Sequence, residues 1–239
     1  MPFAVFDVET RIDKALLKAV LCRGEEISEE EAFTRARDRA AARSSHGSDF
    51  LPLAFHVPIS IVVGSVDDER VLTAVEVLGG GAGEAAMVRE FWDRLERFTG
   101  TLVSFNGRRF DLPVLELAAL RHGCVIPRYF QSGYRYRYAD TAHYDLYDFL
   151  TNCGAYGLRG GFDLLAQLIG LPGKGDVDGA QVQALWEAGR HAEIDSYCRR
   201  DVIQTYFLFL RLELMRGRIT RAQHEAALGA TASLRAELG

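Results

Sequence analysis

The sequence lacks several features that would place it in a disulfide-rich, zinc-binding or membrane class. Its 239 residues include only four cysteines, Cys22, Cys124, Cys153 and Cys198, and no two of them form a C-x-x-C pair. We therefore expect neither a zinc knuckle nor a disulfide framework, and we interpret the cysteines as small, partly buried thiols. No run of 18 or more apolar residues occurs, and no basic segment precedes the first apolar run. We expect neither a membrane-spanning helix nor a secretory signal, and we predict a cytoplasmic protein.

An excess of positive charge is also missing. The formal net charge is -5, so the surface as a whole does not attract nucleic acid. Binding of phosphates depends on local arginines, lysines and metal ions more than on the total charge, and a nucleic-acid enzyme is not excluded. With 48% hydrophobic and 26% charged residues, the composition is that of a globular protein of one or two domains with a substantial core.

The hydrophobic pattern predicts strands that alternate with helices. Short apolar runs predict strands at residues 3–6, 59–63, 70–78 and 101–105, with an edge strand at 138–140. Apolar residues at helical spacing predict helices over residues 84–98, 112–122, 144–150, 162–169, 179–186 and 191–216. Strand, turn and helix in this order are typical of an α/β domain.

Two segments depart from this pattern. Residues 11–50 are rich in Glu, Arg and Ala, and we predict one or two exposed helices inserted between strands, as a solvated charged face or as a binding arm. After Gly217 the composition thins to alanine and charge, so residues 217–239 are predicted to be a peripheral tail. Residues 1–216 are then the main domain.

Four acidic residues and one tyrosine stand in local contexts that make sense together. Asp7 and Glu9 lie at the end of the first predicted strand. Residues two apart on a strand project from the same face, so these two carboxylates lie side by side, about 7 Å apart along the backbone. Tyr197 and Asp201 are four residues apart on a predicted helix and lie on one stripe of it. Asp111 begins a predicted helix after an Asn-Gly turn.

Carboxylates gathered in one place repel each other. At about 5 Å and an effective dielectric near 20, each uncompensated pair costs on the order of 3 kcal/mol, so a cluster demands cations. No histidine or cysteine accompanies these acids in ligand spacing, and ligation by oxygen alone suits Mg²⁺ or Mn²⁺ rather than zinc. Two such ions, typically about 3.5 to 4 Å apart, can activate a water and stabilise the departing oxygen at phosphorus. The sequence predicts a two-metal site that cleaves phosphodiesters.

These motifs resemble the three exonuclease motifs of the DnaQ-like, DEDDy-type 3′-5′ exonucleases. The motifs lie, in the family's order, at residues 6–10, 106–111 and 197–201. Three further stretches resemble predicted exonucleases related to the proofreading domain of B-family DNA polymerases, namely residues 143–146, 168–174 and 176–179. The resemblance implies an α/β, ribonuclease H-like fold. Its five-stranded mixed sheet has three antiparallel strands, then two parallel ones, and helices on both faces.

The resemblance also implies a role for each motif residue. Asp7 bridges the two metal ions, Glu9 and Asp201 hold the first ion with its water, and Asp111 holds the second. Tyr197 orients that water. A free phenol has a pKa near 10, so we favour positioning over proton abstraction for this tyrosine.

The expected activity is removal of nucleotides from a single-stranded 3′ end, with DNA favoured and nucleoside 5′-monophosphates released. Thr10, Asn106, Phe110 and Lys174 are the expected substrate contacts. A 3′-5′ exoribonuclease and a non-catalytic nucleic-acid-binding scaffold of the same fold are the alternatives. The presence of every motif acid counts against the scaffold.

Three assignments stay open in the sequence. Asp140 or Asp145 could replace Asp111 as ligand of the second metal ion. Lys174, flanked by glycines, is either a phosphate contact or part of a surface turn. Residues 128–138 interleave arginine with tyrosine, which suits stacking of a single strand but also suits packed tyrosines beside solvated arginines.

Overall fold

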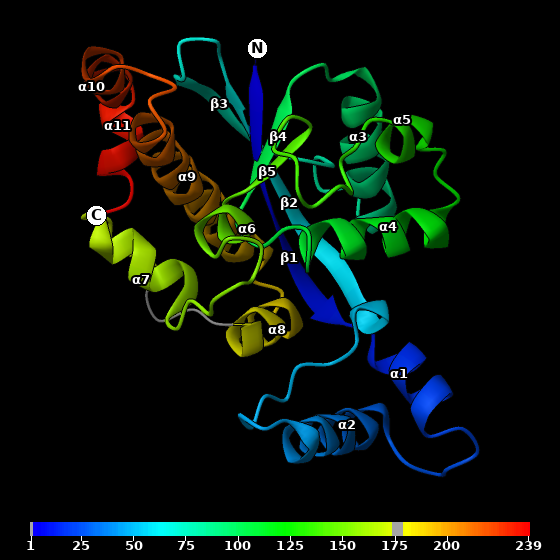
Figure 1. Cartoon of the computed structure of the whole chain (residues 1–239). Coiled ribbons are helices and arrows are strands. Elements are labelled where there is room, and N and C mark those ends of the chain that lie inside the picture. The colour runs from blue at the N-terminus through cyan, green and yellow to red at the C-terminus, as the bar shows by residue number, and fades with distance from the viewer. Residues whose placement is uncertain (1, 174–178) are drawn as a thin grey trace.

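A five-stranded mixed sheet forms the centre of the computed structural model, which describes residues 2–173 and 179–239 (Figure 1). The strands, in spatial order, are β3 (Leu72–Val77), β2 (His56–Val66), β1 (Phe3–Ile12), β4 (Thr101–Ser104) and β5 (His143–Asp145). β1 pairs antiparallel with β2 and parallel with β4, while β2–β3 is antiparallel and β4–β5 parallel. The predicted mixed sheet is confirmed.

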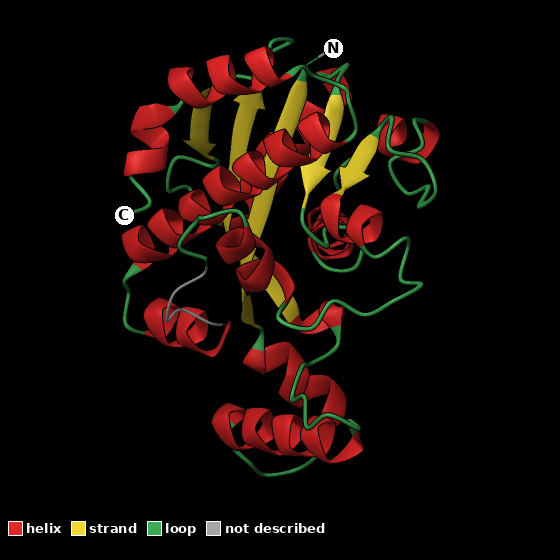
Figure 2. Cartoon of the chain, turned by 60° about the vertical axis from the view of Figure 1, so that its left-hand side comes forward, coloured by secondary structure: helices red, strands yellow, loops and turns green. Residues whose placement is uncertain are grey.

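Helices cover both faces of this sheet, as predicted (Figure 2). The helices are α1 (Lys14–Leu21), α2 (Glu29–Arg43), η1 (Leu53–Phe55, 3₁₀), α3 (Glu84–Arg97), α4 (Asp111–His122), α5 (Pro127–Gln131), α6 (Leu146–Leu150), α7 (Gly161–Leu168), α8 (Gly179–Glu187), α9 (His191–Met215), α10 (Arg221–Ala230) and α11 (Ala232–Ala236). The long helix α9 crosses one face, and α3 and α4 pack on the other. Within the described residues, no helix is both long and apolar enough to cross a bilayer.

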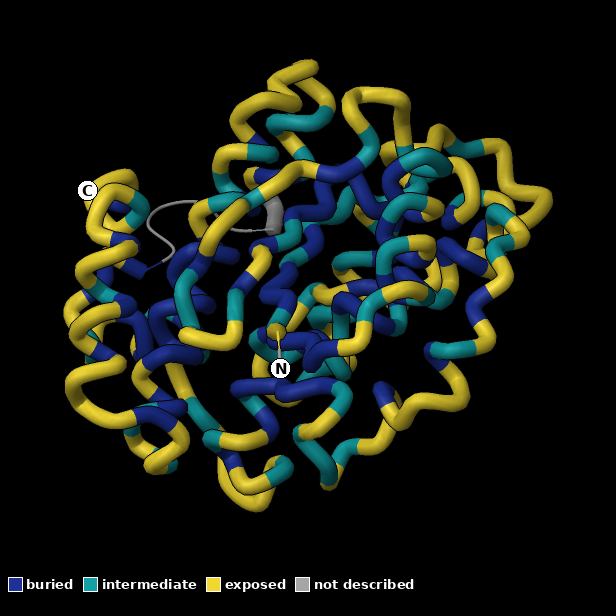
Figure 3. The backbone as a smooth tube through the Cα atoms, turned by 90° about the horizontal axis from the view of Figure 1, so that it is seen from above, coloured by how far each residue is buried: buried dark blue, intermediate teal, exposed yellow. Residues whose placement is uncertain are grey.

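The side chains of β1 alternate between two buried layers. Val5 joins the core that contains α7 and α9, whereas Phe6 and Val8 join the core formed with α3 and α4. Because a strand sends alternate residues to opposite faces, Asp7 and Glu9 share the face of Val5 and are directed toward α9. Figure 3 shows that the buried segments of the chain lie in the interior and that exposed segments surround them.

Helix α9 approaches the sheet closely because β2 has a glycine beneath it. A Cβ atom on Gly64 would lie 2.9 Å from Leu72 Cδ1 and 3.1 Å from Val202 Cγ1. The missing side chain therefore lets α9 rest on β2 at Val202. The neighbouring Asp201 is thereby held close to β1.

Two strand predictions are corrected by the structure. The edge strand is His143–Asp145 rather than residues 138–140, and helix α6 begins only at Leu146. The Asp145 side chain accepts hydrogen bonds from the amides that begin α6, so it ends the strand and starts the helix. β1 continues to Ile12, and Asp7 therefore lies within the strand and not at its end.

The charged insertion is a small helical unit between β1 and β2, which we call the arm (residues 13–55). It projects beyond the end of the sheet in Figure 2. The Asp13 amide donates to the Phe55 carbonyl (2.8 Å), which joins its two ends. The predicted insertion, residues 11–50, differs from the arm at both ends. The pairing of β1 with β2 continues to Ile12 and His56, so the arm begins after Ile12 and ends before His56.

The segment after Gly217 contains two helices, α10 and α11. Ala227 and Leu238 are buried in the same core as α9, so this segment packs on the domain. A separate tail beginning after residue 216 stays a prediction.

Candidate active site

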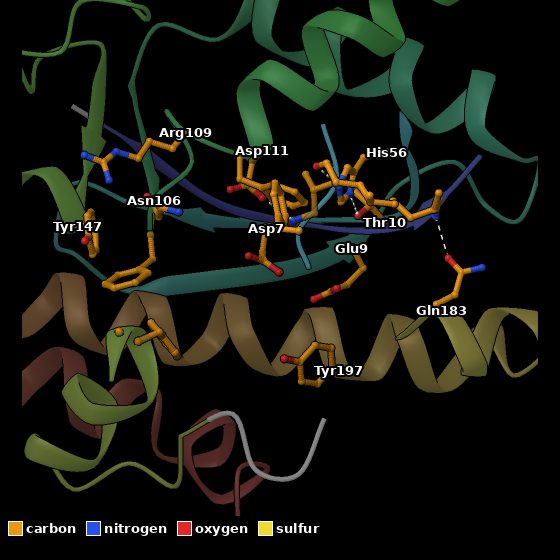
Figure 4. A pocket seen from close by; sticks show the side chains of 18 of the residues that line it. Asp7, Glu9, Thr10, His56, Asn106, Arg109, Asp111, Tyr147, Gln183 and Tyr197 are labelled. Carbon is orange, nitrogen blue, oxygen red and sulfur yellow. Dashed lines mark hydrogen bonds between the residues drawn. The ribbon is translucent and has the colours of Figure 1, made fainter. Parts of the chain in front are cut away.

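Three carboxylates converge between β1 and α9. Asp7 and Glu9 extend from β1 and Asp201 from α9, and one oxygen of each lies within 4.8 Å of the others. Figure 4 shows the Asp7 and Glu9 side chains pointing from the strand toward the helix that carries Tyr197. Asp201 is 2% exposed. Asp7 and Asp201, which are 194 positions apart in the chain, thus belong to one acidic cluster. The sequence predicted this cluster from the two-residue spacing on the strand and the four-residue spacing on the helix.

The local backbone supports this convergence. The pairing of β1 with β2 shifts between Glu9 and Thr10, opposite Pro58, which cannot donate to the ladder. One turn before Asp201, the Cys198 thiol lies 3.5 Å from the Asp7 carbonyl oxygen. Its burial and the nearby carboxylates raise the pKa of Cys198 well above its ordinary value, so the thiol stays neutral. A small uncharged group therefore fills the space where α9 meets β1.

Asp111 lies beside this cluster without belonging to it. Its Oδ1 accepts a hydrogen bond from the Val8 amide (3.1 Å). The pairing of β1 with β4 ends at Val5, so this amide has no partner in β4. It lines the same cavity as Asp7 and Glu9, but among the described residues the close group contains only Asp7, Glu9 and Asp201. The expected cluster of four carboxylates is therefore a group of three with Asp111 nearby.

The two alternative acids have other partners. Asp145 accepts hydrogen bonds from the amides of Asn106 and Arg108, both at 2.9 Å, and so fixes the loop that leads to Asp111. Burial raises the pKa of Asp145 from its ordinary value. Asp140 forms an ion pair with Arg216. Neither is in the group of three, which leaves Asp111 as the better candidate for a second-metal ligand.

The loop before Asp111 leaves no room for a side chain at Gly107. A Cβ atom there would lie less than 3.0 Å from the Ser104 hydroxyl oxygen, and it would lie 3.4 Å from Asp111 Oδ2. Gly107→Ala is therefore expected to displace the loop and lower the hydrolysis rate by about 10- to 100-fold. Gly123→Ala is the control: it strains a left-handed backbone (φ 64°) at the end of α4 but meets no atom within 4 Å. Equal activity of the two variants, measured at matched folded fraction, would contradict this role of Gly107.

A cavity of about 890 Å³ is lined by Asp7, Glu9 and Asp111, while Asp201 is buried and is not among its lining residues. Its walls include Tyr197 and the expected substrate contacts Thr10, Asn106 and Phe110. Lys174, the fourth expected contact, lies outside the described residues. Tyr197 is half-buried and packs beside the cluster formed by β2, α8 and α9. The roles of these side chains stay predictions, but they share one space.

Sequence reasoning missed several residues of this cavity. The Thr10 hydroxyl lies 2.9 Å from His56 Nδ1, and the Phe110 ring meets the His56 ring edge-on at 5.3 Å. Burial lowers the pKa of His56, so its ring is neutral at neutral pH. Arg37 and Phe50 of the arm also line the cavity. They lie in a helix and a loop whose residue pattern gave no sign of a shared site.

The arginine- and tyrosine-rich segment 128–138 divides into two parts. Tyr129 and Tyr134 are buried and stack on each other, with ring centroids 5.9 Å apart. Tyr136 and Tyr138 are exposed. None of these four tyrosines lines the cavity. Packing thus accounts for the first two tyrosines, and the other two are surface residues away from the carboxylates.

Comparison with known proteins identifies the family. Residues 48–237 match the family model of the predicted 3′-5′ exonuclease related to the exonuclease domain of PolB. This range contains Asp111, Tyr197 and Asp201, whereas Asp7 and Glu9 precede it. No match was found among curated proteins.

The fold is similar to part of the family B DNA polymerase from the hyperthermophilic archaeon Pyrobaculum calidifontis. The TM-score is 0.54 at 18% sequence identity, and the match covers 90% of this chain and 24% of the polymerase chain. At this identity the likeness establishes the fold, which is the ribonuclease H-like α/β fold. The family match establishes the enzyme class. The chain belongs to the family of predicted 3′-5′ exonucleases related to the exonuclease domain of PolB.

Proposed function

We propose that this protein hydrolyses single-stranded nucleic acid from the 3′ end with the help of divalent metal ions, favours DNA, and releases nucleoside 5′-monophosphates. The observation that carries the proposal is the convergence of Asp7, Glu9 and Asp201 within 4.8 Å of one another, beside a cavity of about 890 Å³ that Asp7 and Glu9 line. Such a cavity, with a few convergent polar groups, is typical of a binding site.

The donor set fits Mg²⁺ or Mn²⁺. The three carboxylates repel each other, and they offer only oxygen ligands, which these hard ions prefer. Glu9 and Asp201 would hold one ion, Asp111 a second, and Asp7 both. When bound, the ions supply positive charge that activates a water and stabilises the oxygen that leaves phosphorus.

The protein's own side chains have the remaining tasks. Tyr197, one helical turn from Asp201 on the same stripe, positions the attacking water by a hydrogen bond from or to its hydroxyl. Water attacks the terminal phosphorus, and the bond from phosphorus to the 3′ oxygen of the preceding nucleotide breaks. That oxygen gains a proton, leaving a new 3′ hydroxyl and a free nucleoside 5′-monophosphate. Asn106 and Phe110, at the cavity wall, hold the terminal nucleotide.

The preference for DNA is supported by the family. Its description refers to the exonuclease domain of PolB, and the similar solved structure is titled a DNA polymerase. Among the residues that line the cavity, we find no group whose place singles out a ribose 2′-hydroxyl. The exoribonuclease therefore stays the alternative substrate assignment.

Matched single strands of DNA and RNA test this proposal. Each would carry one label at its 5′ end to follow the shortened strands, and the released nucleotides would be identified by chromatography, in Mg²⁺, in Mn²⁺ and in chelator. We expect a ladder that shortens from the 3′ end, mononucleotide products, faster cleavage of DNA, and no cleavage in chelator. Faster cleavage of RNA would support the exoribonuclease. No cleavage of either polymer with either metal would contradict the proposed activity and favour a binding scaffold.

A further inference from the structure

The arm is a fixed part of the molecule. It has its own core, formed by Leu17, Cys22, Ala32, Phe33, Ala36, Leu51 and Phe55. Lys14, at its base, forms ion pairs with Glu30 inside the arm and with Glu187 of α8 (2.6 Å). The Ile12 amide also donates to Gln183 Oε1 of α8 (2.8 Å). The arm is thereby held against α8, beside the cavity.

One side of the arm forms a wall of the cavity that contains Asp7 and Glu9. Phe33 and Arg37 contribute from α2, and Asp49, Phe50 and Leu51 from the loop after it. The charged residues Glu25, Glu31 and Arg35 are joined in a separate ion-pair cluster that does not line the cavity. The arm thus has two different surfaces, and only one faces the carboxylates' cavity.

Phe50 presents an aromatic surface at this wall. It is 56% exposed, although large apolar side chains are usually covered. Its other face stacks on His56 with ring centroids 5.0 Å apart and an interplanar angle of 27°. Phe110 meets both rings edge-on, and Thr10 holds the His56 ring by a hydrogen bond. An exposed ring supported in this way is a platform on which a nucleobase can stack.

Arg37 places a guanidinium on the same wall, where it forms an ion pair with the carboxylate of Asp49, another wall residue. Its guanidinium lies 5.5 Å from the centre of the Phe33 ring, and its Nε donates to Asp49 Oδ2 (2.7 Å). These contacts orient the fork of a group that carries five N–H donors in total. The Arg37 side chain is 41% exposed and lines the same cavity as Phe50, so its remaining N–H donors suit a phosphate of a strand whose base lies on that ring.

We propose that the arm holds the single strand next to the cleavage site, with Phe50 stacking on a base and Arg37 contacting a backbone phosphate. The proposal rests on the proposed exonuclease activity and names a second substrate-binding surface for it. Phe50 and Arg37 then contribute to binding of an oligonucleotide and have no contact with a substrate that consists of one nucleotide.

Two substrates of different length test the arm. The first is a single-stranded oligodeoxynucleotide of about 20 residues, and the second is thymidine 5′-(p-nitrophenyl phosphate), which fills only the cleavage site. Phe50→Ala should raise KM for the oligonucleotide about tenfold, the usual size of a lost base stack, with kcat nearly unchanged. KM and kcat for the nitrophenyl ester should not change. Phe50→Trp keeps an aromatic face and should restore the KM for the oligonucleotide.

Arg37→Ala is the second variant, and Arg35→Ala on the same helix is its matched control. Loss of one phosphate contact should weaken oligonucleotide binding and reduce the slope of log affinity against log salt by about 0.7. Arg35→Ala should leave both values unchanged. Fluorescence anisotropy in an Asp7→Asn background measures this binding without turnover.

The possible outcomes separate the two proposals. If Phe50→Ala and Arg37→Ala bind and cleave the oligonucleotide like the parent, the arm does not contact the strand. If both variants lose activity equally on both substrates, the arm shapes the active site instead, and the inference is also wrong. If the parent cleaves neither substrate but binds the strand through Phe50 and Arg37, the arm inference holds and the exonuclease activity is contradicted.

Discussion

Asp7→Asn should reduce exonuclease activity by about 10³-fold or more, while making the metal-free protein more stable. Asp7 lies within 4.8 Å of both Glu9 and Asp201 in a partly buried group, so a neutral amide there removes charge from the place where divalent ions are needed. The same change removes the repulsion between Asp7 and its two neighbours. We expect a gain of about 1 to 3 kcal/mol in the free energy of unfolding in chelator.

Rates on a labelled oligonucleotide and denaturant unfolding in chelator measure the two effects. Asp93→Asn is the control. It removes the same charge, but from an exposed residue of α3 that does not line the cavity. Stabilities should be compared at the same pH and salt, where the control is expected to change neither quantity. An active Asp7→Asn variant would remove Asp7 from the site. A variant that is inactive but less stable would show that the carboxylates do not strain the metal-free fold.

Saturation with Mn²⁺ should raise the melting temperature of the parent protein by about 5 to 10 °C. A ligand at 100 times its Kd stabilises the folded state by about 2.7 kcal/mol, and about 1 kcal/mol shifts a chain of this length by about 2 to 4 °C. Asp201→Asn should lose most of this shift, since its carboxylate is 2% exposed and is the only member of the group from α9. Differential scanning calorimetry with and without the ion measures the change.

Asp195→Asn gives a matched comparison on the same helix. Asp195 accepts a hydrogen bond from Ser60 and is not in the group of three carboxylates, so this variant should keep the Mn²⁺ shift even if it melts lower overall. A parent protein that shows no shift, or an Asp201→Asn variant that keeps the full shift, would argue against a metal site at this position.

Short-range periodicity predicted the parts of the site that lie on regular elements. Asp7 and Glu9 are two residues apart on a strand, and Tyr197 and Asp201 are four residues apart on a helix. The geometry of a strand and of a helix places each pair on one face. Which elements would then pack together is a long-range property. The place of α9 over β1 depends on contacts such as that of Gly64 with Val202, which no local pattern reveals. The resemblance to the exonuclease motifs supplied that step.

Hydrogen bonds and loops decide the structure around Asp111 and around the elements that the sequence pattern did not predict. Asp111 is drawn to the Val8 amide, because β1 has no strand partner on that side beyond Val5. The edge strand β5 has three residues, too few for an alternating pattern to stand out from its surroundings. Phe50 lies in a loop, which has no periodic pattern, and stacks on His56 at the start of β2.

The central claim is that Asp7, Glu9 and Asp201 form a site for divalent cations beside the cavity that Asp7 and Glu9 line. Anomalous diffraction from a crystal of the protein soaked in Mn²⁺ tests it most directly. The account predicts a manganese peak in contact with oxygens of these three carboxylates, absent from a crystal of the Asp201→Asn variant. Strong anomalous peaks elsewhere on the protein, with none among these carboxylates at saturating Mn²⁺, would contradict it.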